Sequence, residues 1–279
     1  MIIDFHAHIF PPHIRDNRKP YLDRDRTFAH LYSDPKAKLS TVEELIESMD
    51  ASGVDVAVTL NMGWSVHEFC VETNDYIIES ARRYPDRLVP FCGVNPAAGG
   101  DAAAEVERCA KAGVRGIGEL HSYAQGYSLA DSRVMGPVME VVQHHGLIVL
   151  THSSEPVGHL YAGKGTVTPD QLYGFIQSFP QAQVVCAHWG GGLPFYALMP
   201  EVAEALQNVY FDTAASPFLY SPQVFSTVAQ SLGVDKILFG TDFPLIAHKR
   251  LMGQVEGLDW PQTLKEKVLG GNAKALLGL

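Results

Sequence analysis

Five residues of the types that bind transition metals recur at the ends of short apolar runs. They are His6 and His8 in an opening Ile-Asp-Phe-His-Ala-His run, followed by His152, His188 and Asp242. Imidazole and carboxylate groups suit zinc, iron, nickel or manganese. A single buried histidine is commonly a hydrogen-bonded core residue, but four imidazoles and an acid at equivalent places have no evident packing reason to exist. The set therefore predicts a divalent-metal site.

The elements that must position these residues form a repeat of an apolar, strand-like run and a longer segment with helical periodicity. Eight runs are expected to be strands, at residues 2–6, 54–60, 88–94, 114–120, 147–152, 183–188, 208–213 and 236–241. The clearest helical segments span residues 41–51, 73–84, 101–112, 132–145, 168–179 and 221–232. Several strand runs are almost continuously apolar, which is typical of parallel strands covered on both faces.

Strict alternation of strand and helix indicates either an open doubly wound sheet or a closed barrel. The count of eight favours a (β/α)8 barrel, and an open sheet with one miscounted strand is the alternative. A length of 279 residues fits one barrel domain spanning residues 1–279. No glycine-rich dinucleotide or triphosphate motif follows any strand, so the sequence gives no support for a nucleotide site.

A barrel would gather the candidate ligands at one mouth, because catalytic groups lie at the C-terminal ends of its strands. His6 and His8 are two residues apart on one strand, so both side chains would point into that mouth. A divalent metal makes hydroxide available near neutral pH, and Asp242 would take up and return the proton. A protonated His188, or the metal, would stabilise negative charge on the substrate. Asp242 and His188 are therefore the predicted catalytic residues.

These motifs closely resemble those of the amidohydrolase superfamily, in particular its amidohydrolase-related branch, which includes metal-dependent decarboxylases of aromatic and muconic acids. The resemblance covers essentially the whole chain and rests on Ile-Asp-Phe-His-Ala-His, Thr151-His152, Ala187-His188-Trp189-Gly190-Gly191 and Phe239-Gly240-Thr241-Asp242-Phe243-Pro244. It implies that His6, His8 and His152 are metal ligands. It also implies that His188 is a ligand or faces the substrate, and that Asp242 binds metal.

Glu119 ends the fourth predicted strand, and the resemblance gives this position a special meaning. In several branches of the superfamily an acid at this place bridges two metals. One metal would then lie on His6, His8 and Asp242, and the other on His152 and His188. The alternative is a single metal with Glu119 orienting a neighbouring imidazole. Zinc, one or two ions per chain, is the expected metal.

Other polar residues lie near the predicted strand ends and in the loops that follow them. Asp4 and Asp212 are expected to be structural acids or to hold imidazoles in place, rather than to act in catalysis. The loops above the metal offer substrate contacts, and the predicted ones are His121, Tyr123, Trp64 and Lys164. Lys164 and the arginines of the first loop are suited to binding a carboxylate.

The first connection, at about residues 9–40, is unusually long for a loop between a strand and a helix. It mixes arginine and lysine with aspartate. A lid, a substrate-binding arm, a subunit contact and a solvated excursion all remain open interpretations.

Charge and composition restrict the partners. A net charge of −10 argues against a nucleic-acid surface, so a small-molecule substrate is expected. No apolar run is long enough to cross a bilayer and no signal peptide is recognisable, so we expect a cytoplasmic protein without membrane contact. The four cysteines lack close spacing and should be reduced, buried thiols. By family analogy the chain could form a homodimer.

Hydrolysis of an amide, lactone or ester by metal-activated water is the leading functional prediction, with Glu119 as its main support. The alternative is a metal-dependent, non-oxidative decarboxylase or hydratase of an aromatic or unsaturated carboxylic acid. A metal-storage or sensory protein is a third interpretation, which a catalytic acid beside an open metal site disfavours.

Overall fold

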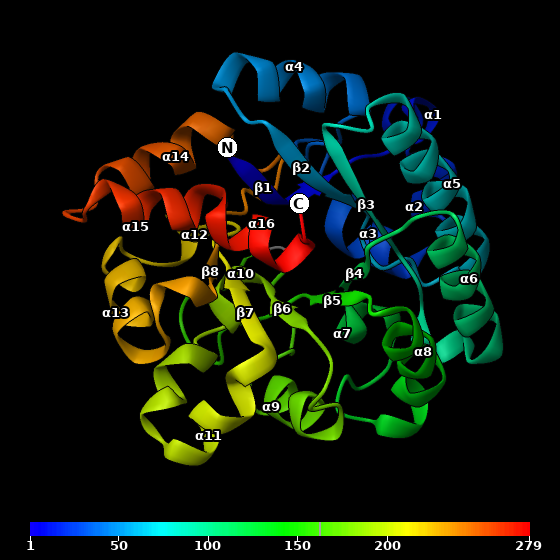
Figure 1. Ribbon diagram of the computed structural model, residues 1–279. Helices are drawn as coiled ribbons and strands as arrows, with labels where there is room; N and C mark the ends of the chain where they lie inside the picture. The colour runs from blue at the N-terminus through cyan, green and yellow to red at the C-terminus, as the bar shows by residue number, and fades with distance from the viewer. Residues whose placement is uncertain (162) are drawn as a thin grey trace.

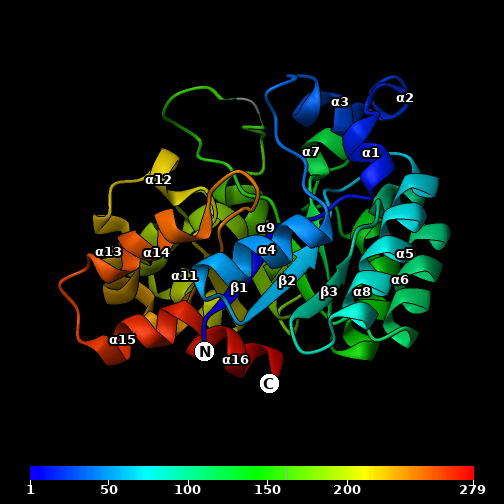
Figure 2. The same ribbon diagram turned by 90° about the horizontal axis from the view of Figure 1, so that it is seen from above.

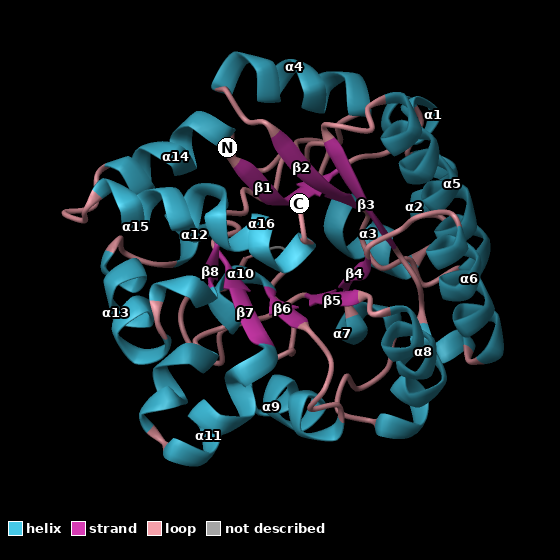
Figure 3. Cartoon of the chain, in the orientation of Figure 1, coloured by secondary structure: helices cyan, strands magenta, loops and turns pink. Residues whose placement is uncertain are grey.

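Eight parallel strands form a barrel in this computed structural model, which describes residues 1–161 and 163–279 (Figures 1 and 3). The strands are β1 (Ile3–His8), β2 (Val56–Leu60), β3 (Leu88–Cys92), β4 (Gly116–Leu120), β5 (Ile148–Thr151), β6 (Val184–Cys186), β7 (Val209–Asp212) and β8 (Ile237–Leu238). Each strand pairs with the next, and the Phe5 amide donates to the Phe239 carbonyl at 2.7 Å, joining β1 to the end of β8. The predicted barrel is confirmed.

Helices surround the barrel in the order that the sequence predicts. The longer ones are α4 (Val42–Ser52), α5 (His67–Arg83), α6 (Gly100–Lys111), α8 (Ser132–His145), α9 (Pro169–Ser178), α13 (Gln223–Leu232) and α14 (His248–Glu256). The shorter ones are α1 (Pro12–Asp16), α2 (Lys19–Leu22), α3 (Arg26–Tyr32), α7 (Ser122–Gln125), α10 (Ala187–Gly190), α11 (Pro200–Ala205), α12 (Ser216–Leu219), α15 (Gln262–Glu266) and α16 (Asn272–Leu277). The capping box of Thr41 and Glu44 begins α4.

Apolar side chains fill the barrel and leave only one end for a site. Phe5, Val58, Phe91 and Leu150 belong to an interior cluster that also includes Ala273 and Leu277 of α16. Helix α16 and both chain termini therefore lie at the amino end of the strands (Figure 2). The carboxyl ends point the other way, towards α1 to α3, α7 and α12.

Strands β6 and β8 end earlier than predicted because their next residues turn sharply or bond to side chains. After β8, the Thr241 amide donates to Asp4 Oδ1 at 2.9 Å, and the Gly240 amide donates to Thr213 Oγ1 at 3.0 Å. After β6, His188 has a left-handed φ of 54°. These departures place Asp242 and His188 on turns rather than on strands.

The long first connection is folded rather than extended. Its helices α1, α2 and α3 cover an apolar cluster separate from the barrel core, which contains Phe10, Phe28 and Trp64. Trp64 stacks on Phe28, with ring centroids 4.9 Å apart. The first connection is thus a small packed unit at the mouth of the barrel (Figure 2).

Asp25 fixes this unit to the barrel, and its replacement by Ala should destabilise the protein. Its buried carboxylate accepts hydrogen bonds at 2.8–2.9 Å from the amides of Phe28, Ser65 and Val66 and from the Ser65 hydroxyl. Leaving these donors unpaired should lower the free energy of unfolding by about 3 kcal/mol in denaturant titrations. Asp23→Ala, which removes an exposed ion pair with Lys19, should change it by less than about 0.5 kcal/mol. Equal effects of the two substitutions would contradict this role for Asp25.

Two smaller expectations concern cysteines and membranes. All four cysteines are free and buried, as predicted. Among the helices of the described residues, none has both the length and the apolar character needed to cross a membrane.

Candidate active site

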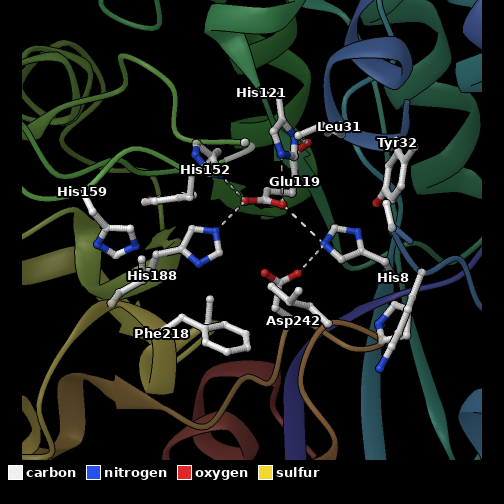
Figure 4. A pocket seen from close by; sticks show the side chains of 18 residues that line it. His8, Leu31, Tyr32, Glu119, His121, His152, His159, His188, Phe218 and Asp242 are labelled. Atoms are coloured by element: carbon white, nitrogen blue, oxygen red, sulfur yellow. Dashed lines mark hydrogen bonds and ion pairs between the residues drawn. The ribbon is translucent and has the colours of Figure 1, made fainter. Parts of the chain in front are cut away.

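The predicted ligands meet at the carboxyl ends of the strands, and Figure 4 labels all of them except His6. They are His6 and His8 on β1, Glu119 on β4, His152 after β5, His188 in the turn of α10 and Asp242 after β8. The imidazoles and Glu119 are all at least 95% buried, and Asp242 is more open, with 16% of its side chain exposed. The structure thus brings together every residue predicted to bind metal.

Glycines allow the backbone to reach these positions. A Cβ on Gly118 would lie 2.3 Å from the Leu150 carbonyl oxygen, so only glycine fits beside β5 immediately before Glu119. A Cβ on Gly191 would lie 2.2 Å from the Ser154 carbonyl oxygen. The glycines after His188 therefore serve a tight turn packed on the β5 loop.

Glu119 occupies the centre of the cluster. Its Oε2 lies 3.4 Å from Nε2 of His6 and 3.4 Å from Nε2 of His8. Its Oε1 lies 3.0 Å from Nδ1 of His152 and 3.3 Å from Nε2 of His188. The two oxygens of this one carboxylate therefore face different groups of imidazoles, and Oε2 also lies 3.4 Å from Nε2 of His121.

These distances fit a divalent ion. Two ligand atoms about 2.1 Å from a metal, at octahedral or tetrahedral angles, lie roughly 3.0 to 3.4 Å apart. The Nε2 atoms of His6 and His8 are 3.0 Å apart, and Asp242 Oδ1 is 3.2 Å from Nε2 of His8. Two groups of three donor atoms lie within 4.8 Å of one another, His6 with His8 and Glu119, and Glu119 with His152 and His188. Glu119 is common to both groups.

The carboxylates around the imidazoles make the cluster favourable for positive charge. Burial opposes ionisation of Asp242, yet the hydrogen bond from His8 and the charge of His6 lower its pKa to about 2. Burial likewise opposes protonation of His188, but Glu119, Asp242 and Asp212 raise its pKa to about 9. Protons or a divalent cation can supply the compensating charge, and protons must leave the ligating nitrogens when metal binds.

Asp212 orients His6, in agreement with the role expected for it. Its Oδ2 accepts from Nδ1 of His6 at 2.8 Å, which leaves the Nε2 lone pair facing the cluster. Its Oδ1 accepts from the amides of His188 and Ala214 at 2.9 and 3.0 Å. Asp4 has a structural role, because it accepts from the Thr241 amide at 2.9 Å and its Oδ2 lies 3.1 Å from Nε2 of His248, which is outside the cluster.

Asp212→Asn should weaken metal binding about 10- to 100-fold, because an amide cannot both accept from His6 and hold the turn of His188. A competition titration with a coloured chelator measures this affinity. Asp50→Asn, an exposed change of the same type, should leave it unaltered. Unchanged affinity in Asp212→Asn would show that Asp212 has only a structural role.

A cavity of about 410 Å³ opens above the cluster, large enough for one aromatic ring with its substituents. The site residues on its wall are His8, Glu119, His121, His152, His188 and Asp242. Apolar side chains, among them Leu31, Phe218 and Leu245, form much of the rest. The cavity therefore suits a flat, largely apolar molecule with a polar end at the cluster.

The four side chains predicted to contact substrate lie in different places in the structure. His121 lines the cavity, stacks on His152 and lies 3.4 Å from Glu119 Oε2 through its Nε2. Tyr123 packs on His152, but its hydroxyl donates to the Gly163 carbonyl. Trp64 is fully buried in the cluster under the first connection, and Lys164 donates to the carbonyls of Val157 and His159. We correct the predictions for Trp64 and Lys164, because both groups are engaged away from the cavity.

Sequence reasoning missed cavity residues that come from distant segments. Tyr32 and Lys38 belong to the first connection, and Phe218 lies on α12 after β7. The only signal for the first two was the unusual length of that connection. Nothing in the sequence pointed to Phe218.

Comparisons with known proteins agree with this fold and site. A family model described as "Amidohydrolase" matches residues 3–279. A 6-methylsalicylic acid decarboxylase from Penicillium expansum is 24% identical, over 98% of this chain and 95% of the relative.

Two solved structures share the fold across the whole chain. The 5-carboxyvanillate decarboxylase of Sphingomonas paucimobilis has a TM-score of 0.83 at 18% identity, covering 100% of this chain and 99% of that one. The 5-carboxyvanillate decarboxylase of Novosphingobium aromaticivorans, solved with manganese and 3-methoxy-4-hydroxy-5-nitrobenzoic acid, also has a TM-score of 0.83 at 18% identity, covering 100% and 97%.

These comparisons overturn the leading functional prediction. Hydrolysis of an amide, lactone or ester is wrong as the main interpretation, because the curated relatives that match the chain by sequence are named decarboxylases. Glu119 was the main support for hydrolysis, but a carboxylate among imidazoles can bind metal in a hydrolase and in a decarboxylase alike. The alternative interpretation, a decarboxylase, agrees better with the relatives.

Proposed function

We propose that this chain, which belongs to the amidohydrolase family, is a divalent-metal-dependent, non-oxidative decarboxylase of an aromatic carboxylic acid. The observation that carries the proposal is the cluster of imidazoles, Glu119 and Asp242 at the floor of a ring-sized cavity. The names of relatives that align with the chain over nearly its whole length support the reaction type.

The reaction requires the site to hold a carboxylate and to supply one proton. When the bond between ring and carboxyl carbon breaks, its electron pair remains on the ring carbon, which takes up a proton as carbon dioxide leaves. A divalent ion held by His6, His8, Glu119 and Asp242 would neutralise the substrate carboxylate and fix its direction. The apolar wall with Phe218 and Leu245 would hold the ring and exclude water.

Asp242 is the proposed proton donor and His188 the group that stabilises negative charge on the substrate. Asp242 is the more open of the two carboxylates at the cavity floor, so its oxygens can reach a bound ring. Its pKa is low before substrate binds. A substrate carboxylate nearby would raise that pKa by charge repulsion, and Asp242 would then take up the proton that the ring carbon needs.

We also propose manganese as the metal, in place of the zinc expected from the sequence. Imidazole and carboxylate ligands suit both metals. A solved decarboxylase with the same fold contains manganese, which supports this choice.

Incubating the metal-loaded protein with a panel of hydroxylated and methylated benzoic acids in heavy water tests the function. We expect equal amounts of carbon dioxide and of an arene with one deuterium at the vacated carbon. Protein treated with a chelator should release neither. Turnover of amide, lactone or ester substrates, with no carbon dioxide from any acid, would refute the proposal.

A further inference from the structure

A second hollow adjoins the active-site cavity. It is lined by the first connection and shares Ala37, Lys38 and Pro244 with the cavity wall. Its basic residues are Arg15, Arg18, Lys36 and Lys38, and we call this hollow the basic recess. A ligand in the cavity can therefore extend towards the basic recess past Lys38.

Most of the positive charge in the basic recess is unpaired. Arg15 forms ion pairs with Asp16 at 2.8 Å and with Glu44 at 2.9 Å. Within residues 1–161 and 163–279, no carboxylate forms an ion pair with Arg18, Lys36 or Lys38. Three unpaired cations at the entrance stand out in a chain with a net charge of −10, and they favour an anion there.

Arg18 is the cation of the basic recess that has a buried nitrogen without an acceptor in the described part of the chain. Its Nη1 is buried and has no hydrogen-bond partner among the described residues. A buried guanidinium nitrogen without an acceptor costs free energy, and a ligand carboxylate would remove that cost. The planar guanidinium offers two parallel N–H groups that match the two oxygens of a carboxylate.

The hydroxyl of Tyr32 is influenced by charges of both the cluster and the basic recess. Burial raises the pKa of its hydroxyl, and the charges of Asp242 and Glu119 raise it further, while the charge of Arg18 opposes them. Tyr32 also lines the cavity, and Figure 4 shows it beside His8. Arg18 lines the basic recess, which shares Ala37, Lys38 and Pro244 with the cavity wall, so its charge lies on the side of the cavity that adjoins the recess.

We propose that Arg18 and Lys38 bind a second carboxylate of the substrate, so that the substrate class is an aromatic dicarboxylic acid. The carboxylate that is lost lies at the cluster, and the one that is kept lies at the basic recess. This inference rests on the proposed function for the first of these positions. It adds a specificity site that the metal cluster alone does not provide.

Equilibrium binding tests the inference without requiring turnover. Isothermal titration of the metal-loaded protein compares isophthalate, which has two carboxylates, with benzoate, which has one. We expect isophthalate to bind about tenfold tighter or more, as a charge-assisted hydrogen bond of about 1.5 kcal/mol predicts. Arg18→Gln and Lys38→Ala should each weaken isophthalate about tenfold and leave benzoate within about twofold. Metal content should not change.

Two further variants act as controls. Lys36→Ala removes the same charge from the same loop. Lys36 is exposed, has no place on the cavity wall and lacks the buried, unpartnered nitrogen of Arg18, so this substitution should leave both affinities within about twofold. Lys38→Arg keeps the charge at the cavity wall and should retain the preference for isophthalate. If Arg18→Gln fails to fold, Lys38→Ala and Lys38→Arg still decide the question, because Lys38 is exposed.

Equal binding of the two acids by the unmodified protein would overturn the inference, as would parallel weakening of both acids in Lys38→Ala. The proposed function fails separately. If no acid releases carbon dioxide but the preference for isophthalate depends on Arg18 and Lys38, the carboxylate site stands and the reaction does not. If monocarboxylic acids are decarboxylated and the variants change nothing, the reaction stands and the carboxylate site does not.

Discussion

Replacing Asp242 by Asn should lower the rate of decarboxylation about 1000-fold, the largest effect on activity that we expect from one conservative change. Asn preserves the shape of the side chain but cannot take up and deliver the proton that the ring carbon requires. The backbone also suits the substitution, because Asp242 has a left-handed φ of 62°, a conformation that Asn adopts readily. A large loss of activity would therefore indicate the loss of proton transfer rather than misfolding of the protein.

The measurement is kcat at saturating manganese and substrate, with metal content determined on the same samples. Asp259→Asn, an exposed substitution of the same type, should retain full activity. Asp242 is also a proposed ligand, so reduced metal content would assign part of the loss to binding. More than a tenth of the normal kcat with full metal content would mean that another group, with His188 the first candidate, delivers the proton.

The sequence was sufficient for the barrel and for the set of residues at its mouth. Parallel strands buried on both faces are apolar along their length, so their positions could be recognised one by one. A ligand such as His152 could then be found as the polar residue that ends a strand. Glu119 is likewise the polar residue near the end of its strand, and it lies 3.0 Å from His152 in the cluster.

Features that depend on contacts between distant segments could not be predicted. The early end of β8 depends on Asp4, which lies more than 230 residues earlier in the chain and accepts from the Thr241 amide. The sequence predicts Trp64 as an aromatic substrate contact, but the first connection folds over it and buries it. The reaction type was beyond reach for a similar reason, because the metal ligands are compatible with hydrolysis and with decarboxylation alike.

Replacing Glu119 by Gln should lower the metal content from about two equivalents per chain to about one. Each oxygen of Glu119 belongs to a different group of donors, so the carboxylate is placed to bridge two ions. A Gln side chain presents one oxygen and one NH2 group and cannot bridge. The position on His6 and His8 should survive, because Asp242 remains as its third ligand. The position on His152 and His188 would keep only two ligands and should be lost.

Metal analysis of the purified protein and of Glu119→Gln, both saturated with manganese and then dialysed, measures this difference. Glu105→Gln is the matched control, since Glu105 is also a buried acid but pairs with Arg108 on the outside of the barrel. Its metal content should equal that of the unmodified protein. One equivalent in all three proteins would mean that Glu119 orients imidazoles around a single ion, because a carboxylate that bridges nothing can be replaced without losing metal. Decarboxylation would remain possible in that case, since the ion beside Asp242 is the one that the proposed reaction uses.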